Sequence, residues 1–260
     1  DKAVECFLAG LDADRRTFGP QAHFGANPAH LSVYLRIACI HLQGKSPEKA
    51  LAILDKAEKQ FPDQARISYL RALAHREAGE LDKAIQDYTA TVQRAKPGDN
   101  IISSSFYVEF GALCEQSGQF DQAAEHLRKA IELDQKNATA LNYLGYMWAN
   151  RGINLDEAMD LIRKALAIEP RNGAYIDSLG WVFFKQGKYQ EALVQLEKAA
   201  HLIENEDDVV FDHLAETHFH LKNYREAVKF WEKCLTLKPD KTDYQRKLEE
   251  AKAKAGKEQR

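Results

Sequence analysis

Three side chains able to bind a metal ion or to transfer protons lie in the segment FDHLAETHFH, residues 211–220. His213, Glu216 and His220 are spaced i, i+3 and i+7, so a helix would carry them on one face. Two imidazoles and a carboxylate suit zinc or a similar ion, which makes a metal-binding or hydrolytic site one hypothesis for this segment. The spacing differs from HExxH, however, and three ligands spread over two helical turns reach one ion poorly. We therefore expect no metal and no cofactor.

The remaining sequence motifs do not indicate an enzyme. The chain has no GxxxxGK[ST] phosphate loop, no GxGxxG fingerprint and no GxSxG turn. Acidic pairs such as Asp207-Asp208 fit a solvated helix face or a helix start better than a catalytic pair. The cysteines are far apart and form no CxxC motif, so we expect free thiols rather than a zinc or redox site. They are Cys6, Cys39, Cys114 and Cys234.

The charge balance argues against nucleic acid and membranes as partners. Lysine and arginine number 36 and aspartate and glutamate 39, which gives a formal net charge of -3. Such a chain offers no basic surface to nucleic acid or anionic lipid. No apolar run approaches the roughly 20 residues that a membrane-spanning helix needs. Unpaired cysteines favour a reducing compartment.

The aromatic segment DSLGWVFFKQG, residues 177–187, is the strongest candidate for a binding surface. Trp181, Phe183 and Phe184 crowd into four positions, where they could form core, a ligand pocket or a docking surface. Which of these applies depends on the elements that carry the three rings. Those elements follow from an internal repeat.

The chain repeats with a period close to 34 residues. Six segments aligned on one alanine are spaced by 34, 39, 35, 34 and 35 residues. A large residue follows each alanine four positions later, which is the pattern of a helix with one buried face. The alanines are Ala50, Ala84, Ala123, Ala158, Ala192 and Ala227, and the large residues are Leu54, Tyr88, Leu127, Ile162, Leu196 and Trp231.

A second pattern precedes each alanine and is clearest in LNYLGYMW, residues 141–148, and IDSLGWVF, residues 176–183. Together the two patterns resemble the tetratricopeptide repeat, W-x2-L-G-x2-Y followed by A-x3-F and a proline, over nearly all of residues 28–239. The resemblance implies an all-α fold, a right-handed α-solenoid of about six helix pairs. The small residues Gly145, Gly180 and Ala192 would let paired helices approach closely, and a large side chain there would overpack the contact.

In proteins similar to this one, a second face of each first helix lines a concave groove. The resemblance places Asp177, Trp181 and Phe184 on that face. Aromatic anchors with polar neighbours suit the binding of a peptide. The alternative is that these rings only pack between adjacent first helices. The full predicted groove consists of Asn142, Tyr146, Asp177, Trp181, Phe184, Asp212, Glu216 and Phe219.

The predicted groove is acidic, with few basic residues, so we expect a basic or mixed hydrophobic-basic protein or peptide as the partner. Some tetratricopeptide domains clamp a terminal carboxylate with lysine, arginine and asparagine, and Asn142 matches such a position. Asp177 and Asp212 occupy the equivalent position in the next two repeats. This argues against a carboxylate clamp.

The two ends of the chain depart from the repeat. Residues 1–27 join a segment similar to a second helix to an irregular, proline- and glycine-containing stretch, so we expect half a repeat there, with further repeats before it. Residues 240–260 are strongly charged, with one apolar stripe of Tyr244, Leu248 and Ala251, as expected of a capping helix and tail. Inside the array, Ser68 stands where a large residue is expected.

We therefore expect a non-enzymatic scaffold that binds a protein or peptide segment in its groove. The alternative is a structural or self-associating module of a larger tetratricopeptide protein, because half a repeat leaves an apolar face uncovered. The metal hypothesis at His213, Glu216 and His220 comes third. The repeat pair at residues 142–192 looks like those of bacterial tetratricopeptide proteins, many of which are exported or envelope-associated.

Overall fold

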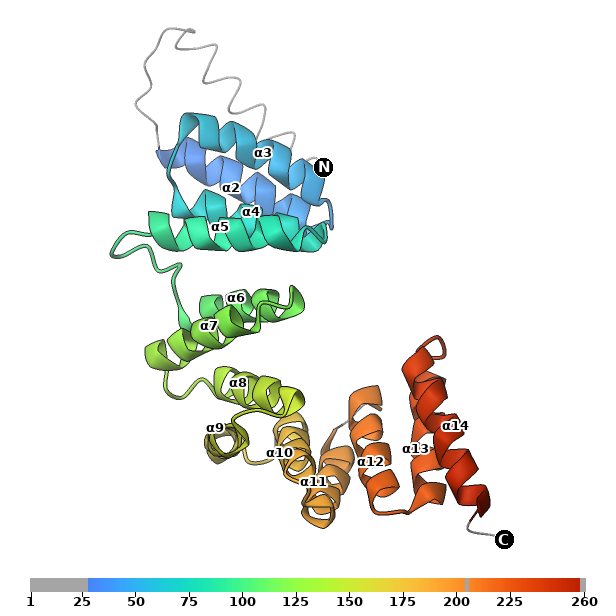
Figure 1. The fold of residues 1–260 in the computed structure, drawn as a ribbon. Helices are drawn as coiled ribbons and strands as arrows, with labels where there is room; N and C mark the ends of the chain where they lie inside the picture. The colour runs from blue at the N-terminus through green and yellow to red at the C-terminus, as the bar shows by residue number, and fades with distance from the viewer. Residues whose placement is uncertain (1–27, 204–205, 258–260) are drawn as a thin grey trace, which may run out of the picture. The chain divides into compact units, whose positions relative to one another are not determined.

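A computed structural model describes residues 28–203 and 206–257, and every regular element in these ranges is an α-helix (Figure 1). The predicted half repeat at residues 1–27 lies outside the described residues. The helices are α2 (Pro28–Gln43), α3 (Pro47–Gln60), α4 (Ala65–Glu77), α5 (Leu81–Arg94), α6 (Ser104–Gln116), α7 (Phe120–Leu133), α8 (Ala138–Arg151), α9 (Leu155–Ile168), α10 (Gly173–Lys185), α11 (Tyr189–Leu202), α12 (Asp208–His220), α13 (Tyr224–Leu237) and α14 (Thr242–Lys257).

Consecutive helices form pairs. Short turns join α2 to α3, α4 to α5, α6 to α7, α8 to α9, α10 to α11 and α12 to α13, and α14 packs on α13. The described part of the chain thus confirms the predicted all-α repeat fold of six helix pairs followed by a C-terminal helix. None of the described helices is both long enough and apolar enough to cross a membrane.

The repeat positions form the interior of each helix pair. All six repeat alanines are fully buried, and so are the large residues four positions after them. Each first helix approaches its partner closely where it carries glycine. A Cβ atom at Gly145 would lie 2.7 Å from Ile162 Cγ1 and 2.9 Å from the carbonyl oxygen of Ala158, and one at Gly180 would lie 2.7 Å from Leu196 Cγ. The small residues therefore fix how closely the paired helices pack.

Local sequence signals set where the helices begin and end. The side chains of Asn137, Asn172 and Asp207 accept hydrogen bonds from backbone N–H groups in the first turns of α8, α10 and α12. Gly187 ends the α10 region with a φ of 76°, a left-handed conformation that glycine adopts without strain. Lys222 adopts the same conformation, with a φ of 65°, in the equivalent turn after α12.

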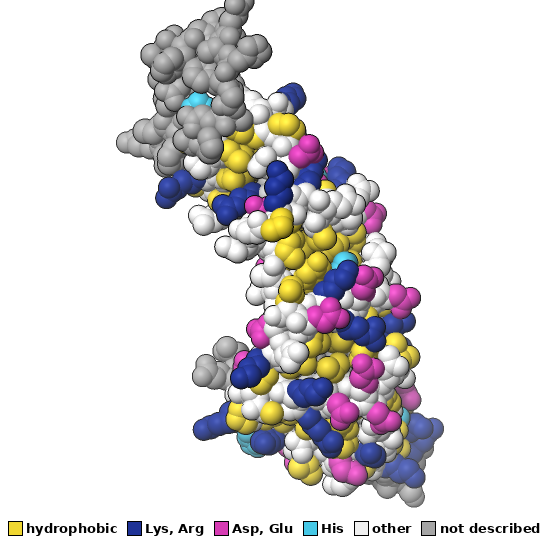
Figure 2. All heavy atoms as spheres, turned by 90° about the vertical axis from the view of Figure 1, so that its left-hand side faces the viewer, with side chains coloured by type: hydrophobic (Ala, Val, Ile, Leu, Met, Phe, Trp, Pro, Cys, Tyr) yellow, Lys and Arg dark blue, Asp and Glu magenta, His cyan; other side chains and the backbone are white. Residues whose placement is uncertain are grey.

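The chain divides into two compact units, Asp1–Ala130 and Ile131–Arg260. Their charged side chains are of both signs and interspersed on the face drawn in Figure 2. In the first unit, stacked rings join the second and third described repeats: Tyr88 stacks on Phe110 with centroids 5.0 Å apart, and Phe110 on His126 at 3.8 Å. Burial, with a smaller effect of Lys129, lowers the pKa of His126 to about 4. That imidazole is therefore neutral at physiological pH.

In one repeat of the first unit, a polar side chain stands where the repeat pattern predicts a large apolar one. Ser68 is buried, and its hydroxyl accepts a hydrogen bond of 2.8 Å from Arg94 Nη1. The same guanidinium group forms an ion pair with Glu58 at 3.1 Å. Helices α3, α4 and α5 are therefore held together at this point by a hydrogen-bonded arginine instead of the large apolar side chain that the repeat predicts.

The second unit has a continuous core that ends under α14. Trp231 and Cys234 of α13 are buried against Tyr244, Leu248 and Ala251 of α14. The opposite face of α14 is strongly charged and exposed. The C-terminal helix thus covers the last repeat, as its narrow apolar stripe predicts.

Candidate functional site

A pocket of about 450 Å³ lies on the first helices of the second unit. Its residues come from α8, α10, α12, the first turns of α14 and the residue before α14, and none comes from α9, α11 or α13. We call it the first-helix pocket. It is lined by Tyr146, Asn150, Trp181, Phe184, Lys185, Val209, Asp212, His213, Glu216, His220, Lys241, Tyr244 and Lys247.

A row of stacked rings forms one wall of the first-helix pocket. Trp181 is stacked between His213, with ring centroids 3.9 Å apart, and Phe184, at 4.5 Å. His220 continues the row, meeting Phe184 edge-on at 5.1 Å. Lys185 places its ammonium group 4.7 Å from the centroid of Trp181, close enough for a cation–π interaction. The row joins helices α10 and α12 and gives the pocket a rigid aromatic side.

A buried acid–imidazole contact positions this row. His213 Nδ1 lies 3.0 Å from both carboxylate oxygens of Asp177, and both side chains are buried. The contact links α10 to α12 and fixes the plane of the imidazole on which Trp181 stacks. Thr217 adds to the polar interior of α12, since its hydroxyl donates to the carbonyl of His213 at 2.7 Å. Asp177 therefore has a supporting role beneath the pocket.

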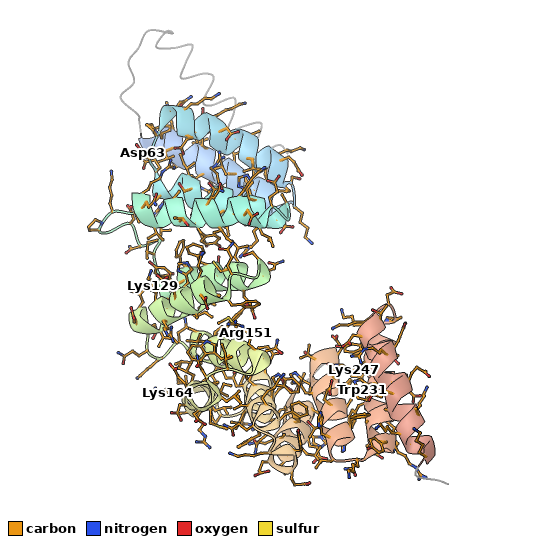
Figure 3. All side chains as sticks on the ribbon, in the orientation of Figure 1. Asp63, Lys129, Arg151, Lys164, Trp231 and Lys247 are labelled. Atoms are coloured by element: carbon orange, nitrogen blue, oxygen red, sulfur yellow. The ribbon has the colours of Figure 1, made fainter. Side chains whose placement is uncertain are left out.

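Lys247 of α14 pairs with the acidic side of the pocket. Its ammonium group lies 2.9 Å from carboxylate oxygens of both Asp212 and Glu216. Trp231 Nε1 also donates to Asp212, at 2.8 Å, and Figure 3 shows Lys247 and Trp231 side by side next to α12. Burial alone would lower the pKa of Lys247, but its hydrogen bonds to the two carboxylates outweigh burial and raise that pKa. The lysine is thus charged and offsets both acids.

The structure brings five of the eight predicted groove residues together and buries two of the key ones. Tyr146, Trp181, Phe184, Asp212 and Glu216 line the first-helix pocket. We expected Trp181 to be exposed in the groove, but only 7% of its surface is accessible. It packs between α10 and α12, which is the alternative that the sequence left open. Asp177, also expected on the groove surface, is buried because it holds His213.

The other two predicted residues lie outside the pocket. Asn142 has a buried side-chain oxygen that accepts no hydrogen bond from the described residues. Phe219 packs against the core, with its ring centroid 5.3 Å from that of Tyr224 and 5.8 Å from that of Trp231. Phe219 therefore contributes to the contact between α12 and α13.

The pocket also contains residues that the repeat pattern does not indicate. Lys241 and Lys247 come from the segment after the last repeat, and Lys185 from the last turn of α10. Their positions relative to the carboxylates depend on how α14 packs, and no repeat period fixes that. The expected scarcity of basic groups is wrong for this pocket, because its lining contains three lysines beside the two carboxylates of Asp212 and Glu216.

The predicted metal ligands do not converge on one point. His213 is engaged with Asp177, and His220 stacks on Tyr189 with centroids 4.7 Å apart. Within residues 28–203 and 206–257, no three histidine, cysteine, aspartate or glutamate side chains are grouped so that they could hold a metal ion. Glu216 instead forms its ion pair with Lys247. Each of the three side chains is therefore engaged with another residue of this chain.

Three family models match successive parts of the chain. The first is described as a tetratricopeptide repeat and matches residues 35–100. The second, described as a TPR repeat, matches residues 111–150. The third, described as anaphase-promoting complex, cyclosome, subunit 3, matches residues 151–234.

One curated relative is the human mitochondrial import receptor subunit TOM70, 29% identical over 116 residues. The match covers 45% of this chain and 17% of the receptor. This chain thus spans less than a fifth of the receptor's length.

Solved structures share the fold. The chain is similar to the anaphase-promoting complex hetero-tetramer Cut9–Hcn1, with a TM-score of 0.68 and 22% identity over 94% of this chain and 45% of that chain. A tetratricopeptide repeat protein from Parabacteroides merdae gives a TM-score of 0.64 and 18% identity, covering 96% of each chain. YrrB, described as a TPR protein with an unusual peptide-binding site, gives a TM-score of 0.62 and 19% identity, covering 78% of this chain and 95% of its own. Together with the buried repeat positions and the helix pairs, these matches identify the chain as a tetratricopeptide repeat protein.

Proposed function

We propose that this chain is a non-enzymatic scaffold that binds a segment of another protein across the first-helix pocket. Tetratricopeptide folds are typically interaction scaffolds, and the pocket is the feature of this chain that carries the proposal. It joins an aromatic wall to charged groups from α10, α12 and the C-terminal segment around α14 within about 450 Å³. Pockets of this kind fix the orientation of a bound chain through a few polar groups while apolar contacts supply affinity.

The half-buried rings of Tyr146 and Phe184 are the proposed anchor points. Trp181 lies in the same wall but is covered by its neighbours, so it supports the wall and contributes little contact area. An apolar or aromatic side chain of the partner would pack against the two half-buried rings. Aromatic contacts of this kind dominate binding energy because they bury much area at little cost in side-chain entropy.

Charge gives the proposed partner its second property. A basic segment would pair with Asp212 and Glu216, as the sequence predicts, but it must displace Lys247, which already contacts both at 2.9 Å. We therefore propose a partner segment that carries an apolar anchor beside a basic residue and exchanges with the α14 lysine. Removal of the Lys247 charge should then strengthen binding of such a segment, whereas it would leave purely apolar binding unchanged.

Two of the similar proteins support the proposal by their names. One is an import receptor subunit and the other is described by its peptide-binding site.

Selection from a displayed library of random peptides tests the proposal directly. Peptides selected on the wild-type protein are labelled, and their affinities are measured by fluorescence anisotropy. We expect Tyr146→Ala and Phe184→Ala each to weaken binding about tenfold, which corresponds to about 1.4 kcal/mol. The matched control is Ile168→Ala, which removes a 41% exposed side chain from α9, outside the pocket.

Two results would contradict the proposal. One is selected peptides whose affinity is unchanged in both pocket variants. The other is equal loss of affinity in the control. Thermal unfolding followed by circular dichroism shows whether each variant is folded. Light scattering at increasing concentration tests the alternative of self-association, which predicts a mass that rises with concentration.

A further inference from the structure

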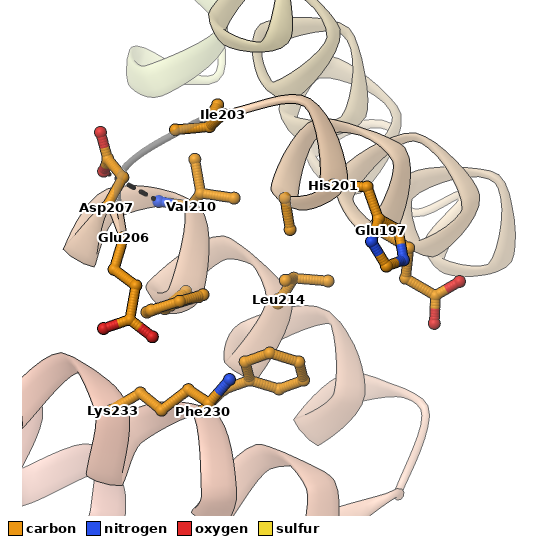
Figure 4. A pocket seen from close by; sticks show the side chains of 11 residues that line it. Glu197, His201, Ile203, Glu206, Asp207, Val210, Leu214, Phe230 and Lys233 are labelled. Carbon is orange, nitrogen blue, oxygen red and sulfur yellow. Dashed lines mark hydrogen bonds between the residues drawn. The ribbon is translucent and has the colours of Figure 1, made fainter.

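A second pocket lies on a different set of helices in the same unit. It has a volume of about 550 Å³ and is formed by α11, α12, α13 and three residues between α11 and α12, Ile203, Glu206 and Asp207 (Figure 4). It shares no residue with the first-helix pocket. We call it the α11–α13 pocket. It is lined by Glu197, Ala200, His201, Ile203, Glu206, Asp207, Val210, Phe211, Leu214, Phe230 and Lys233.

The floor of the α11–α13 pocket is apolar. Val210, Phe211 and Leu214 present one face of α12, and Figure 4 shows Phe230 of α13 opposite Leu214. The ammonium group of Lys233 lies 4.9 Å from the ring centroid of Phe211 and 5.5 Å from that of Phe230. The lysine thus interacts with the two rings at one side of the opening. The volume of the α11–α13 pocket falls within the range of roughly 300–1,000 Å³ that is typical of ligand pockets.

Carboxylates without ion-pair partners lie at the rim. Glu197 and Glu206 are exposed, and neither forms an ion pair with a described residue. Asp207 differs from them because its carboxylate already caps α12 by accepting from the N–H groups of Val209 and Val210. The opening therefore carries two negatively charged carboxylates without ion-pair partners, whereas the ammonium group of Lys233 lies over the aromatic rings.

The apolar surface continues beyond the rim along α11. Val194 lies one helical turn before Glu197 on the same stripe of the helix, and 56% of its surface is exposed. An occupant would therefore meet an apolar pocket, an apolar extension and two free carboxylates. An acidic occupant would place like charges against Glu197 and Glu206, which opposes binding.

We propose that the α11–α13 pocket is a second protein-docking site, for a segment that inserts one phenylalanine-sized side chain between basic residues. The apolar side chain occupies the space between Leu214 and Phe230, and the flanking lysine or arginine side chains pair with Glu197 and Glu206. The site goes beyond the proposed function because it lies on α11, α13 and another face of α12, shares no residue with the first-helix pocket, and can be occupied while that pocket is also bound. Two sites of this kind would let one short array hold two partners, or two segments of one partner.

Methyl nuclear magnetic resonance of the whole chain tests this site with defined probes. The probe is the peptide acetyl-Lys-Lys-Phe-Lys-Lys-amide, and its controls replace phenylalanine by alanine or all lysines by glutamate. We expect the phenylalanine–lysine probe to shift the methyl signals of Ile203, Val210 and Leu214, and each control to bind at least about tenfold more weakly. The Glu197→Lys/Glu206→Lys variant should also lose about tenfold in affinity.

A matched variant carries the same charge change at a distance. Glu249→Lys/Glu250→Lys alters two exposed carboxylates of α14 and should keep wild-type affinity. Phe184→Ala should leave the probe-induced shifts of Ile203, Val210 and Leu214 unchanged, which separates this site from the first-helix pocket.

Three outcomes would overturn the inference. The three probes could bind with equal affinity, or the two charge variants could lose probe affinity equally. The probe could also shift the indole signal of Trp181 and leave the methyl signals of the α11–α13 pocket unchanged. Shifts of the pocket methyl groups that arise from raised protein concentration alone would identify a second copy of the chain as the occupant and would also overturn it.

Discussion

The close approach of α8 and α9 at Gly145 allows a prediction whose sign follows from the geometry. Replacing a helical glycine by alanine normally stabilises a helix by about 1 kcal/mol. At Gly145 the new methyl group would lie 2.7 Å from Ile162 Cγ1 and 2.9 Å from the carbonyl oxygen of Ala158. Carbon atoms pack best at about 3.5–4.0 Å, and a backbone oxygen of α9 cannot rotate away as a side chain can.

The gain in helix propensity and the cost of the close contact have opposite signs, and the cost is larger. Overpacking of a tight core costs roughly 1–3 kcal/mol, which exceeds the helix-propensity gain. We therefore expect Gly145→Ala to destabilise the protein by about 1 kcal/mol. At Gly256, in the last turn of α14, a Cβ atom would meet nothing within 4 Å. The same substitution there should stabilise by about 0.5 kcal/mol, with the full gain reduced by fraying of the helix end.

Tryptophan fluorescence during urea unfolding is the appropriate assay. All three tryptophans, Trp148, Trp181 and Trp231, belong to the second unit, which also contains both glycines. The signal therefore reports the unit in which the changes are made. A Gly145→Ala protein as stable as the wild type, or a Gly256→Ala protein less stable than Gly145→Ala, would refute the packing argument. Gly180→Leu and Ala192→Leu should both lose more stability than Gly145→Ala, because their side chains are larger and the same helix contact is closed.

Three further predictions concern charged and polar groups. Lys247→Met should destabilise by about 2 kcal/mol, because it leaves two half-buried carboxylates without their cationic partner. The loss is measured by urea unfolding at neutral pH. It should shrink as the pH rises above 10.5, the ordinary lysine pKa, because the unfolded chain then releases the proton that the raised pKa keeps on the folded ammonium group. His126→Phe should flatten the pH dependence of the unfolding free energy between pH 6.5 and pH 4. The pKa of the imidazole is lowered in the folded protein, so in this range the unfolded chain binds the extra proton and wild-type stability falls as the pH falls. Equal slopes of unfolding free energy against pH in the two proteins would contradict this. Asp177→Ala should cost about 3 kcal/mol and Asp177→Asn about 1 kcal/mol, because the amide can still accept from His213 whereas alanine leaves the imidazole nitrogen buried and unpaired; equal unfolding midpoints for the two variants would argue against the hydrogen bond.

The fold could be predicted from the sequence because its determinants are local and periodic. Each repeat alanine and the large residue after it must meet the partner helix, and the same spacing recurs in every unit of about 34 residues. The buried positions are kept even where the residue type departs from the repeat pattern. At Ser68, the position stays buried and Arg94 supplies the contact that a larger side chain would have made.

The candidate site was only partly predictable because its decisive contacts lie between repeats. Trp181 was assigned to a face that lines the groove, with packing between adjacent first helices as the alternative. Whether it would be exposed depended on the residue opposite, and His213 covers it at 3.9 Å. The sequence contains a hint: Asp177 and His213 are 36 residues apart, about one repeat, so an acid and an imidazole of adjacent first helices were bound to be neighbours.

The charge of the pocket depended on a helix outside the repeat period. Lys247 belongs to α14, whose packing on α13 no alignment of repeats can give. The polarity of the groove was therefore predicted from the acidic residues of the first helices alone, Asp177, Asp212 and Glu216. Lys241 and Lys247 could have been predicted for the groove if side chains of the C-terminal segment had been considered together with those of the repeats.

The most direct test of the central claim is site-specific photo-crosslinking in the native cell. A photoreactive phenylalanine analogue is placed at Tyr146, in the first-helix pocket, and in a second protein at Ile168, on α9 outside it. If the first-helix pocket binds a protein segment, the Tyr146 position will give a discrete crosslinked partner, and a peptide selected on the purified chain will compete it away. Crosslinking that is absent at Tyr146, or equally strong at Ile168 and insensitive to the peptide, would contradict the account.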